Sequence, residues 1–217
     1  MRDQKKDEIE MAERREKMLD VGFRIFSEHS IEAVPMQKIA EACGVGYATL
    51  YRYFNSKLVF AIAIATKKWD EFFEIVEEEY ARRGGTHMNA AEELDFYLGC
   101  YILLYREHRD ILSFNQNFNS YVTHEHATPE QLQPYGASIM NYVKKFHFLY
   151  EKGKTDGTIR TDLPENKMFV STMHIMLAVT ARFAEGVLYR AGGEADLTEE
   201  LLLLKRSLMA QFILKQS

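Results

Sequence analysis

The stretch that decides the fold is VPMQKIAEACGVGYATLYRYFNSK, residues 34–57. After Pro35 it predicts a short helix over QKIAEAC, a turn at Gly44 and a second helix over GYATLYRY. Proline suits a first helical position, where its missing N–H is no loss, and glycine suits the left-handed residue that ends a helix. Helix, glycine turn and helix in this order are typical of the helix-turn-helix of DNA-binding proteins.

The second helix of this segment has two different faces. Leu50 and Phe54 are apolar and spaced to point into the head, together with Ile39 of the first helix. The i, i+4 pairs of the opposite face are Tyr47 with Tyr51 and Ala48 with Arg52. Phenols and a guanidinium can donate hydrogen bonds to phosphates and base edges, so this outer face is expected to meet DNA. Tyr53 can belong to either face, and the sequence leaves its side open.

The chain on both sides of this segment has the spacing of helices. Leu19, Gly22, Phe23 and Phe26 recur at i, i+3, i+4 and i+7, which predicts a helix over about residues 7–29 with one buried face. Further helices are expected over about residues 57–82, 90–109, 110–119, 128–152, 165–190 and 197–215, with an irregular stretch at 120–128 and a loop at 153–164. Asn89 and Glu92 have the spacing of a capping box, and Gly192 and Gly193 separate the last two helices.

The predicted fold class is therefore all-α. Four prolines and twelve glycines are few for the turns of a β-sandwich or barrel, which supports the same class. The expected domains are a three-helix head, residues 1–56, with the helix-turn-helix, and a larger helical body, residues 57–217. No linker is expected between them, because the helix beginning at Lys57 continues from one into the other.

The charge of the chain is unevenly divided. The formal net charge is −5, yet residues 1–57 hold ten Lys/Arg and ten Asp/Glu, so the whole acidic excess lies in residues 58–217. A neutral head can carry a local DNA-binding surface, whereas the acidic body is not suited to lie near phosphate.

Other classes of protein find little support. Cys43 and Cys100 have no CxxC partner and indicate reduced thiols, and the charged N-terminal residues resemble no secretory signal, so a cytoplasmic protein is expected. The longest apolar run, residues 58–65, is far shorter than the roughly 20 residues that cross a bilayer. His124 and His126 are too few for a zinc site, and no GxSxG, Walker or GxGxxG motif is present. We therefore expect no metal, no cofactor and no enzymatic activity.

The stretch IAEACGVGYATLYRYFNSK, residues 39–57, resembles the signature of the tetracycline-repressor (TetR) family of transcription regulators. The shared elements are IA, G-V, TLY, Y-F and S-K, and the likeness covers about residues 12–60. The resemblance implies a homodimer that binds a palindromic DNA operator with its heads and a small molecule with its bodies. It also implies that the last two helices form the dimer.

The resemblance assigns DNA contacts residue by residue. The positions that match are Gln37, Tyr47, Ala48, Thr49, Tyr51, Tyr53 and Lys57, and the residues expected to bind DNA also include Gly46 and Arg52. Lys57 matches a phosphate-binding lysine at the start of a helix, where the helix dipole also attracts anions. Two departures stand out: no Ser or Thr lies at Pro35 or Met36, and Gly46 stands where a capping serine is frequent.

The body is rich in aromatic and methionine side chains, which suits an apolar or aromatic ligand. The expected ligand-binding residues are Tyr101, Phe118, Tyr142, Phe146 and His174. Four consecutive leucines begin at Leu201, too many for one stripe of a helix, so one side is expected to face a partner subunit. The expected dimer seam is Leu201, Leu204, Leu208 and Phe212.

The function predicted from these features is a homodimeric repressor that a small apolar or aromatic ligand releases from its operator. An activator, or a regulator without a ligand, would have the same sequence features. A helical small-molecule-binding protein or enzyme with a vestigial head is the other alternative.

Overall fold

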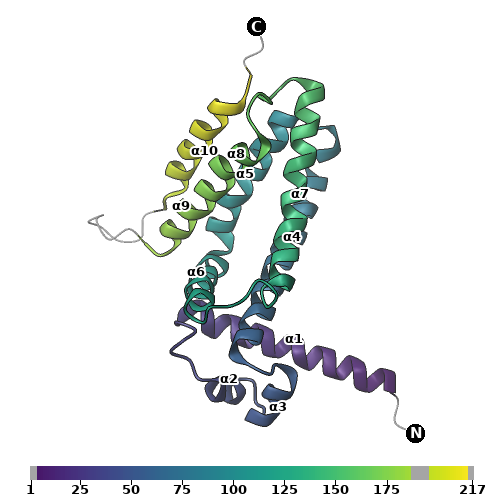
Figure 1. Ribbon diagram of the computed structural model, residues 1–217, viewed down its shortest axis with the longest axis vertical. Coiled ribbons are helices and arrows are strands. Elements are labelled where there is room, and N and C mark those ends of the chain that lie inside the picture. Colours follow the sequence, from purple (N-terminus) through teal and green to yellow (C-terminus); the bar gives the residue numbers. More distant parts are fainter. Residues whose placement is uncertain (1–3, 187–195, 215–217) are drawn as a thin grey trace. The chain divides into compact units, whose positions relative to one another are not determined.

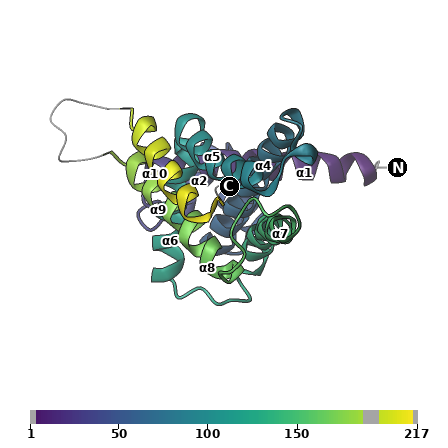
Figure 2. The same cartoon turned by 90° about the horizontal axis from the view of Figure 1, so that it is seen from above.

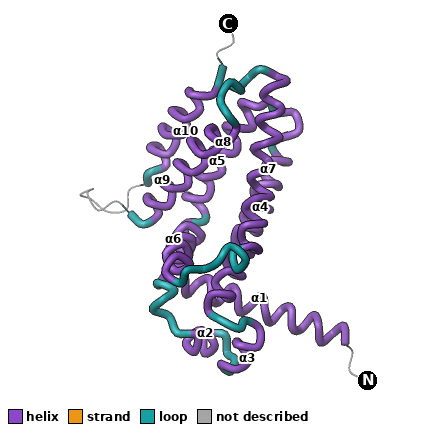
Figure 3. Tube along the Cα trace, in the orientation of Figure 1, coloured by secondary structure: helices purple, strands orange, loops and turns teal. Residues whose placement is uncertain are grey.

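A computed structural model describes residues 4–186 and 196–214 of the chain (Figure 1). Its helices are α1 (Gln4–Glu28), α2 (Met36–Ala42), α3 (Tyr47–Tyr53), α4 (Lys57–Arg82), α5 (Ala90–Glu107), α6 (Arg109–His124), α7 (Gln133–Asp156), α8 (Glu165–Phe169), α9 (Ile175–Ala184) and α10 (Thr198–Phe212). Short non-α turns occupy Gly85–His87 and Val170–His174. Loops join the helices, and no strand occurs in the described ranges, so the all-α class is confirmed (Figure 3).

Several element boundaries differ from the prediction. The stretch 120–128 is wrong as an irregular segment, because α6 continues to His124 and buries Tyr121 on the same side as Phe118. The loop expected at 153–164 begins later, since α7 continues to Asp156. A π-helical turn, Val170–His174, interrupts the helix expected over 165–190. Gly192 and Gly193 lie outside the described residues.

The chain forms two compact units that each combine segments distant in sequence. The first contains the chain up to Trp69 and Ser113–Ser138, and the second contains Asp70–Leu112 and the chain from Ile139 onward. The division therefore lies further along α4 than the expected boundary after residue 56. Helices α4, α6 and α7 each contribute residues to both units.

In the first unit, α1 and α4 approach closely at a glycine. The predicted face of α1 is buried, with Leu19, Phe23 and Phe26 at most 6% exposed. A Cβ atom on Gly22 would lie 2.3 Å from Cζ of Phe60, so only glycine fits there. The ring of Phe60 is itself held between those of Phe26 and Phe54, at centroid distances of 5.9 and 4.7 Å.

In the second unit, α5 packs against α9 and α10. The last two helices lie side by side in both ribbon views (Figures 1 and 2). Between α4, α5 and α7 the unit is filled by aromatic rings. Phe73 stacks on Tyr142 at 4.4 Å and an interplanar angle of 6°, and Tyr97 meets Tyr142 edge-on at 5.9 Å.

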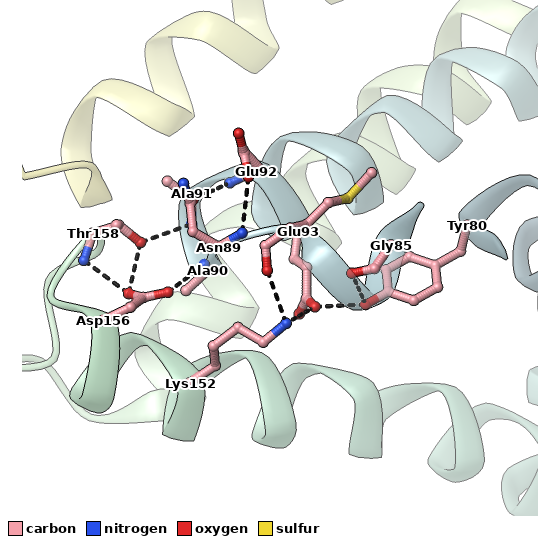
Figure 4. A network of polar contacts seen from close by, with 11 residues as sticks. Tyr80, Gly85, Asn89, Ala90, Ala91, Glu92, Glu93, Lys152, Asp156 and Thr158 are labelled. Atoms are coloured by element: carbon pink, nitrogen blue, oxygen red, sulfur yellow. Dashed lines mark hydrogen bonds and ion pairs between the residues drawn. The ribbon is translucent and has the colours of Figure 1, made fainter. Parts of the chain in front are cut away.

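The N-terminus of α5 is fixed by a polar network (Figure 4). Asn89 and Glu92 form the predicted capping box, which is confirmed, with bonds of 2.9 and 2.8 Å. At the end of α7, Asp156 accepts from the backbone N–H of Ala90 at 2.7 Å, and Thr158, just beyond the helix, accepts from that of Ala91.

One turn further along α5, a buried carboxylate continues this network. Glu93 is 5% exposed and pairs with Lys152 of α7, and it also accepts from the Tyr80 hydroxyl at 2.5 Å. A buried charge is tolerable only when it is paired and hydrogen-bonded, as here. The network therefore fastens α4, α5 and α7 together within the second unit.

Asp156→Ala is expected to lower the free energy of unfolding by about 1 kcal/mol, the usual value of a helix cap. Burial acts to raise the pKa of Asp156, but the hydrogen bonds from Thr158 and Ala90 prevail and lower it. Because the folded-state pKa is depressed, this stabilisation is full above the unfolded-state pKa and is lost as the pH falls through the folded-state value. Denaturant unfolding of both proteins between neutral and acidic pH measures the difference.

The matched control is Asp70→Ala, at an exposed position in the interior of α4, away from the ends of the helix. This control should change stability by less than about 0.5 kcal/mol. A difference between wild type and Asp156→Ala that persists undiminished at the lowest pH would contradict the assigned role of the carboxylate.

Candidate nucleic-acid interface

The turn between α2 and α3 depends on one left-handed residue. Gly44 has φ +68°, and no atom lies within 4 Å of the position a Cβ would take, so the glycine is required for its backbone conformation and not for space. The N–H groups of Gly44 and Val45 donate to the carbonyls of Glu41 and Ala40, each at 3.0 Å, and close the end of α2. Gly46 then begins α3 without a side-chain cap.

The two predicted faces of α3 are confirmed. Leu50 and Phe54 are 0% and 1% exposed and fasten the helix to the head. The exposed side chains of the opposite face are Tyr47, Ala48, Tyr51 and Arg52. Thr49 and Tyr53 are intermediate, and the Tyr53 ring lies 6.4 Å from that of Phe54. Tyr53 is thus half-buried at the edge of the outer face, which answers the question the sequence left open.

The two exposed phenols of α3 form a pair. The rings of Tyr47 and Tyr51 lie 4.7 Å apart and tilted by 42°, and the side chains remain 50% and 37% exposed. A hydrogen bond with Tyr51 raises the pKa of Tyr47 above its ordinary value. Since each ring restrains the other, this surface is formed before any partner arrives.

Lys57 has a position that the sequence did not reveal. Its ammonium donates to the carbonyl oxygens of Ile31, Glu32 and Val34 at 2.8, 3.0 and 3.2 Å, in the connection between α1 and α2. It also lies 5.5 Å from the centre of the Tyr121 ring. Burial lowers the pKa of Lys57, although nearby Glu125 and Glu32 act in the opposite direction.

This geometry argues against the phosphate contact predicted for Lys57. An ammonium has three N–H donors, and three backbone carbonyls already receive them. The lysine instead holds the start of α4 to the segment that enters α2, and so positions the helix-turn-helix. The sequence contained no sign of this role, because the partners are backbone atoms 23 to 26 residues away.

Helix α6 also supports the head, which the sequence did not indicate. The Asn117 amide donates to the carbonyls of Phe26 and His29 at 2.8 and 3.3 Å, so a side chain of α6 caps the C-terminal end of α1. The Trp69 indole N–H donates to Asn115 at 3.3 Å and joins α4 to α6. Both contacts lie within the first unit.

Gln37, expected to contact DNA, is exposed on α2. Its amide nitrogen donates to the Glu41 carboxylate at 3.3 Å. A primary amide has a second N–H donor and an oxygen acceptor besides this one, so Gln37 keeps hydrogen-bonding capacity toward an outside partner.

Arg52→Ala is expected to weaken binding to a specific DNA site by about 10- to 100-fold, the range of one lost bidentate base contact. Arg52 is exposed on α3, so the thermal midpoint should stay unchanged. Fluorescence anisotropy with labelled DNA, together with a melting curve, checks both parts. Unchanged affinity at every salt concentration would remove Arg52 from the interface.

The expected ligand-binding residues do not form one group. Tyr101 and Tyr142 are half-buried side chains of the second unit, and burial raises the pKa of each. Phe146 is 2% exposed in the aromatic core of the same unit. Phe118 belongs to the core of the first unit, stacked on Phe114 at 5.9 Å. His174 is exposed at the end of the π turn, so its predicted position in an apolar pocket is not supported.

The expected dimer seam requires a correction. Leu201, Leu208 and Phe212 are 0%, 4% and 2% exposed within a single chain, so they belong to its own core and cannot supply a partner surface. Leu204 is intermediate. The leucine that α10 leaves exposed is Leu203, at 59%.

A surface groove of about 590 Å³ lies elsewhere in the second unit, between α4, α5 and α10. Ile75, Ile102 and Leu202 contribute to its apolar part, and Arg82 and Arg83 share the Glu79 carboxylate at its edge. None of the expected ligand-binding residues lines this groove.

Two further structural tests concern metals and membranes. Within residues 4–186 and 196–214, no three His, Cys, Asp or Glu side chains converge as a metal site. None of the helices described is long and apolar enough to cross a membrane.

These features define a helix-turn-helix protein. One face of its second helix, α3, is buried in the head, and the opposite face is exposed to solvent. Residues 18–64 match the family described as bacterial regulatory proteins, tetR family. The resemblance inferred from the TLYRYF segment is thereby confirmed. The helix-turn-helix region of the chain is therefore that of the TetR family of bacterial regulatory proteins.

Individual relatives agree with this assignment. The HTH-type transcriptional regulator SAR2658 of Staphylococcus aureus is 26% identical over 153 residues, 69% of this chain and 72% of that protein. The HTH-type transcriptional repressor KstR of Mycolicibacterium smegmatis is 33% identical over 87 residues, 40% and 41% of the two chains. A solved structure of AibR in complex with isovaleryl coenzyme A and operator DNA has a TM-score of 0.62 at 21% identity, and covers 91% of this chain and 96% of its own. The first two of these proteins are transcriptional regulators by name, and the third was solved with operator DNA.

Proposed function

We propose that this regulator is a homodimeric repressor that binds a palindromic operator through α3 and leaves it when a small apolar ligand binds the second unit. The observation that carries the DNA-binding part is the exposed outer face of α3, with its paired phenols and Arg52, on a helix anchored by Leu50. The contacts proposed for Gln37, Gly46, Thr49 and Tyr53 rest on the family resemblance. Lys57 takes a positioning role in this proposal.

The proposal of a ligand rests on two side chains of the second unit. Tyr101 and Tyr142 are desolvated and yet partly accessible, and the surrounding rings favour an apolar or flat ligand. AibR, which has a similar fold, was solved with isovaleryl coenzyme A, and this makes acyl-coenzyme A thioesters the first compounds to test.

The proposed release requires the ligand to prefer the state that does not fit the operator. Helices α4, α6 and α7 have residues in both units, so a change in the second unit can reach the first along continuous helices. Asn117 of α6 and Lys57 of α4 both donate hydrogen bonds to backbone carbonyls of the head. A movement of α4 or α6 would therefore move the head with it.

The ligand part is tested by titrating acyl-coenzyme A thioesters of increasing chain length into a complex of the protein with its selected DNA. We expect at least one to release the DNA, and Tyr142→Ala to shift the concentration required. Tyr142 stacks on Phe73, so the stability of the variant must be measured beside its response. If no thioester or simple apolar acid releases the DNA, the proposed ligand response is contradicted. The result would then favour a regulator that works without a ligand.

The dimer is proposed to form through α9 and α10, with Leu203 at the interface. Leu203→Glu is expected to convert a dimer to a monomer, because an apolar side chain 59% exposed in one chain would be replaced by a charge at the partner surface. Light scattering after size-exclusion chromatography measures the mass. The matched control is Phe148→Glu, at a 66% exposed position on α7, which should leave the mass unchanged. A Leu203→Glu protein that stays dimeric would place the interface elsewhere.

A further inference from the structure

The outer face of α3 is poor in groups that read bases by hydrogen bonds. Its exposed side chains are Tyr47, Ala48, Tyr51 and Arg52. The residues that most often discriminate bases in the major groove are Arg and Lys with guanine, Asn and Gln with adenine, and Asp and Glu with cytosine. Arg52 is the one member of that set on this face of α3. Direct readout of several positions of a half-site must therefore use another kind of contact.

Helix α2 adds little to this hydrogen-bonding capacity. Its exposed amide, Gln37, already donates to Glu41 at 3.3 Å. A bidentate contact with adenine would have to use the second N–H of this amide together with its oxygen, so α2 adds one such group at most.

The phenol pair has limited donor capacity and a large apolar surface. Each phenol has a single O–H donor, so the pair can offer two hydrogen bonds at most to outside acceptors such as phosphates. The rings remain 50% and 37% exposed, and the methyl group of Ala48 lies beside Tyr47 on the same face. An apolar surface inserted in the major groove finds one apolar partner on the base edges, the C5-methyl group of thymine.

We infer that this regulator reads its half-site chiefly through thymine C5-methyl groups, which contact the Tyr47 ring and the Ala48 methyl, while Arg52 reads a guanine. The inference rests on the proposed DNA binding through α3 and adds the base chemistry of the site. In this inference the Tyr51 ring packs against that of Tyr47 and restrains it. The Tyr51 hydroxyl donates a hydrogen bond to a phosphate of the DNA backbone. The neutral charge of residues 1–57 agrees with a head that depends on contacts of this kind more than on many phosphate pairs.

Deoxyuridine is the appropriate probe, because it removes the methyl group of thymine and keeps its hydrogen-bonding edge. The wild-type full-length chain is first used to select a palindrome from random DNA. Each thymine of the half-site is then replaced by deoxyuridine, and affinity is measured by fluorescence anisotropy. We expect about a fourfold loss for each contacted methyl group, from the burial of one methyl. Replacing the two symmetry-related thymines should cost about fifteenfold.

Two variants separate the ring from the hydroxyl. Tyr47→Ala should abolish the deoxyuridine penalty at the thymine that this ring contacts, and Tyr47→Phe should retain it. Deoxyuridine outside the half-sites serves as the control and should have no effect.

The outcomes distinguish this inference from the proposed function. A selected palindrome that tolerates deoxyuridine at every thymine, or that contains none, overturns methyl readout and leaves operator binding intact. Methyl readout is also overturned if the Tyr47→Ala variant loses as much affinity as the wild type at every deoxyuridine. The phenols would then only position the protein on phosphates. If no palindrome is enriched, operator binding itself is contradicted, and methyl readout with it.

Discussion

Replacing Gly22 with leucine is expected to unfold the first unit near physiological temperature. A Cβ atom at this position would lie 2.3 Å from Cζ of Phe60 and 2.8 Å from Cδ1 of Ile64. Phe60 is fully buried and its ring contacts those of Phe26 and Phe54, so any shift of the ring must displace these neighbours. Overpacking of a core costs about 1–3 kcal/mol, and more where the backbone must separate, against a total stability of roughly 5–15 kcal/mol.

Thermal unfolding followed by circular dichroism measures this effect, and we expect the midpoint to fall by about 10 °C or more. The matched control is Gly136→Ala in α7, where no atom lies within 4 Å of the added Cβ. This control should leave the midpoint unchanged or raise it, because alanine favours helix more than glycine by about 1 kcal/mol. Equal midpoints for Gly22→Leu and wild type would contradict the close approach of α1 and α4.

The second large effect is expected from Lys57→Met. The substitution keeps an unbranched apolar stem and removes the ammonium that donates to the carbonyls of Ile31, Glu32 and Val34. Hydrogen bonds to a charged group contribute about 1.5–3 kcal/mol each, and water can replace part of this at a half-exposed site. We therefore expect the free energy of unfolding to fall by about 2–3 kcal/mol.

Denaturant unfolding gives this difference, with Lys38→Met as the matched control. Lys38 is exposed on α2, so its replacement should cost less than about 0.5 kcal/mol. For Lys57→Met, the salt dependence of DNA binding distinguishes the positioning role from a phosphate contact. An unchanged slope supports positioning, whereas a shallower slope with unchanged stability would restore the phosphate contact.

The recognition segment was predictable because its signals are local. The left-handed glycine at Gly44, the buried Leu50 and the exposed Tyr47 all follow from spacing within a few residues. Patterns of this kind set the helix and its faces before any tertiary contact is known.

The features that were not predictable depend on contacts distant in sequence. The partners of Lys57 are backbone carbonyls, which leave no pattern of side chains to recognise. Leucines on two sides of α10 indicated that the helix packs against both its own chain and a partner subunit. The pattern could not tell which of the two sides faces the chain's own core. The structure buries Leu201 and exposes Leu203, and so reverses the expected side.

The most direct test of DNA recognition by α3 compares two selections from random DNA. One uses the wild-type chain, and the other uses the double variant Tyr47→Ala/Tyr51→Ala, whose positions are exposed, so its thermal midpoint should match that of the wild type. We predict that the wild type enriches a palindrome and that the folded double variant does not. Enrichment of the same palindrome by both proteins, or of none by the wild type, would contradict recognition through this face of α3.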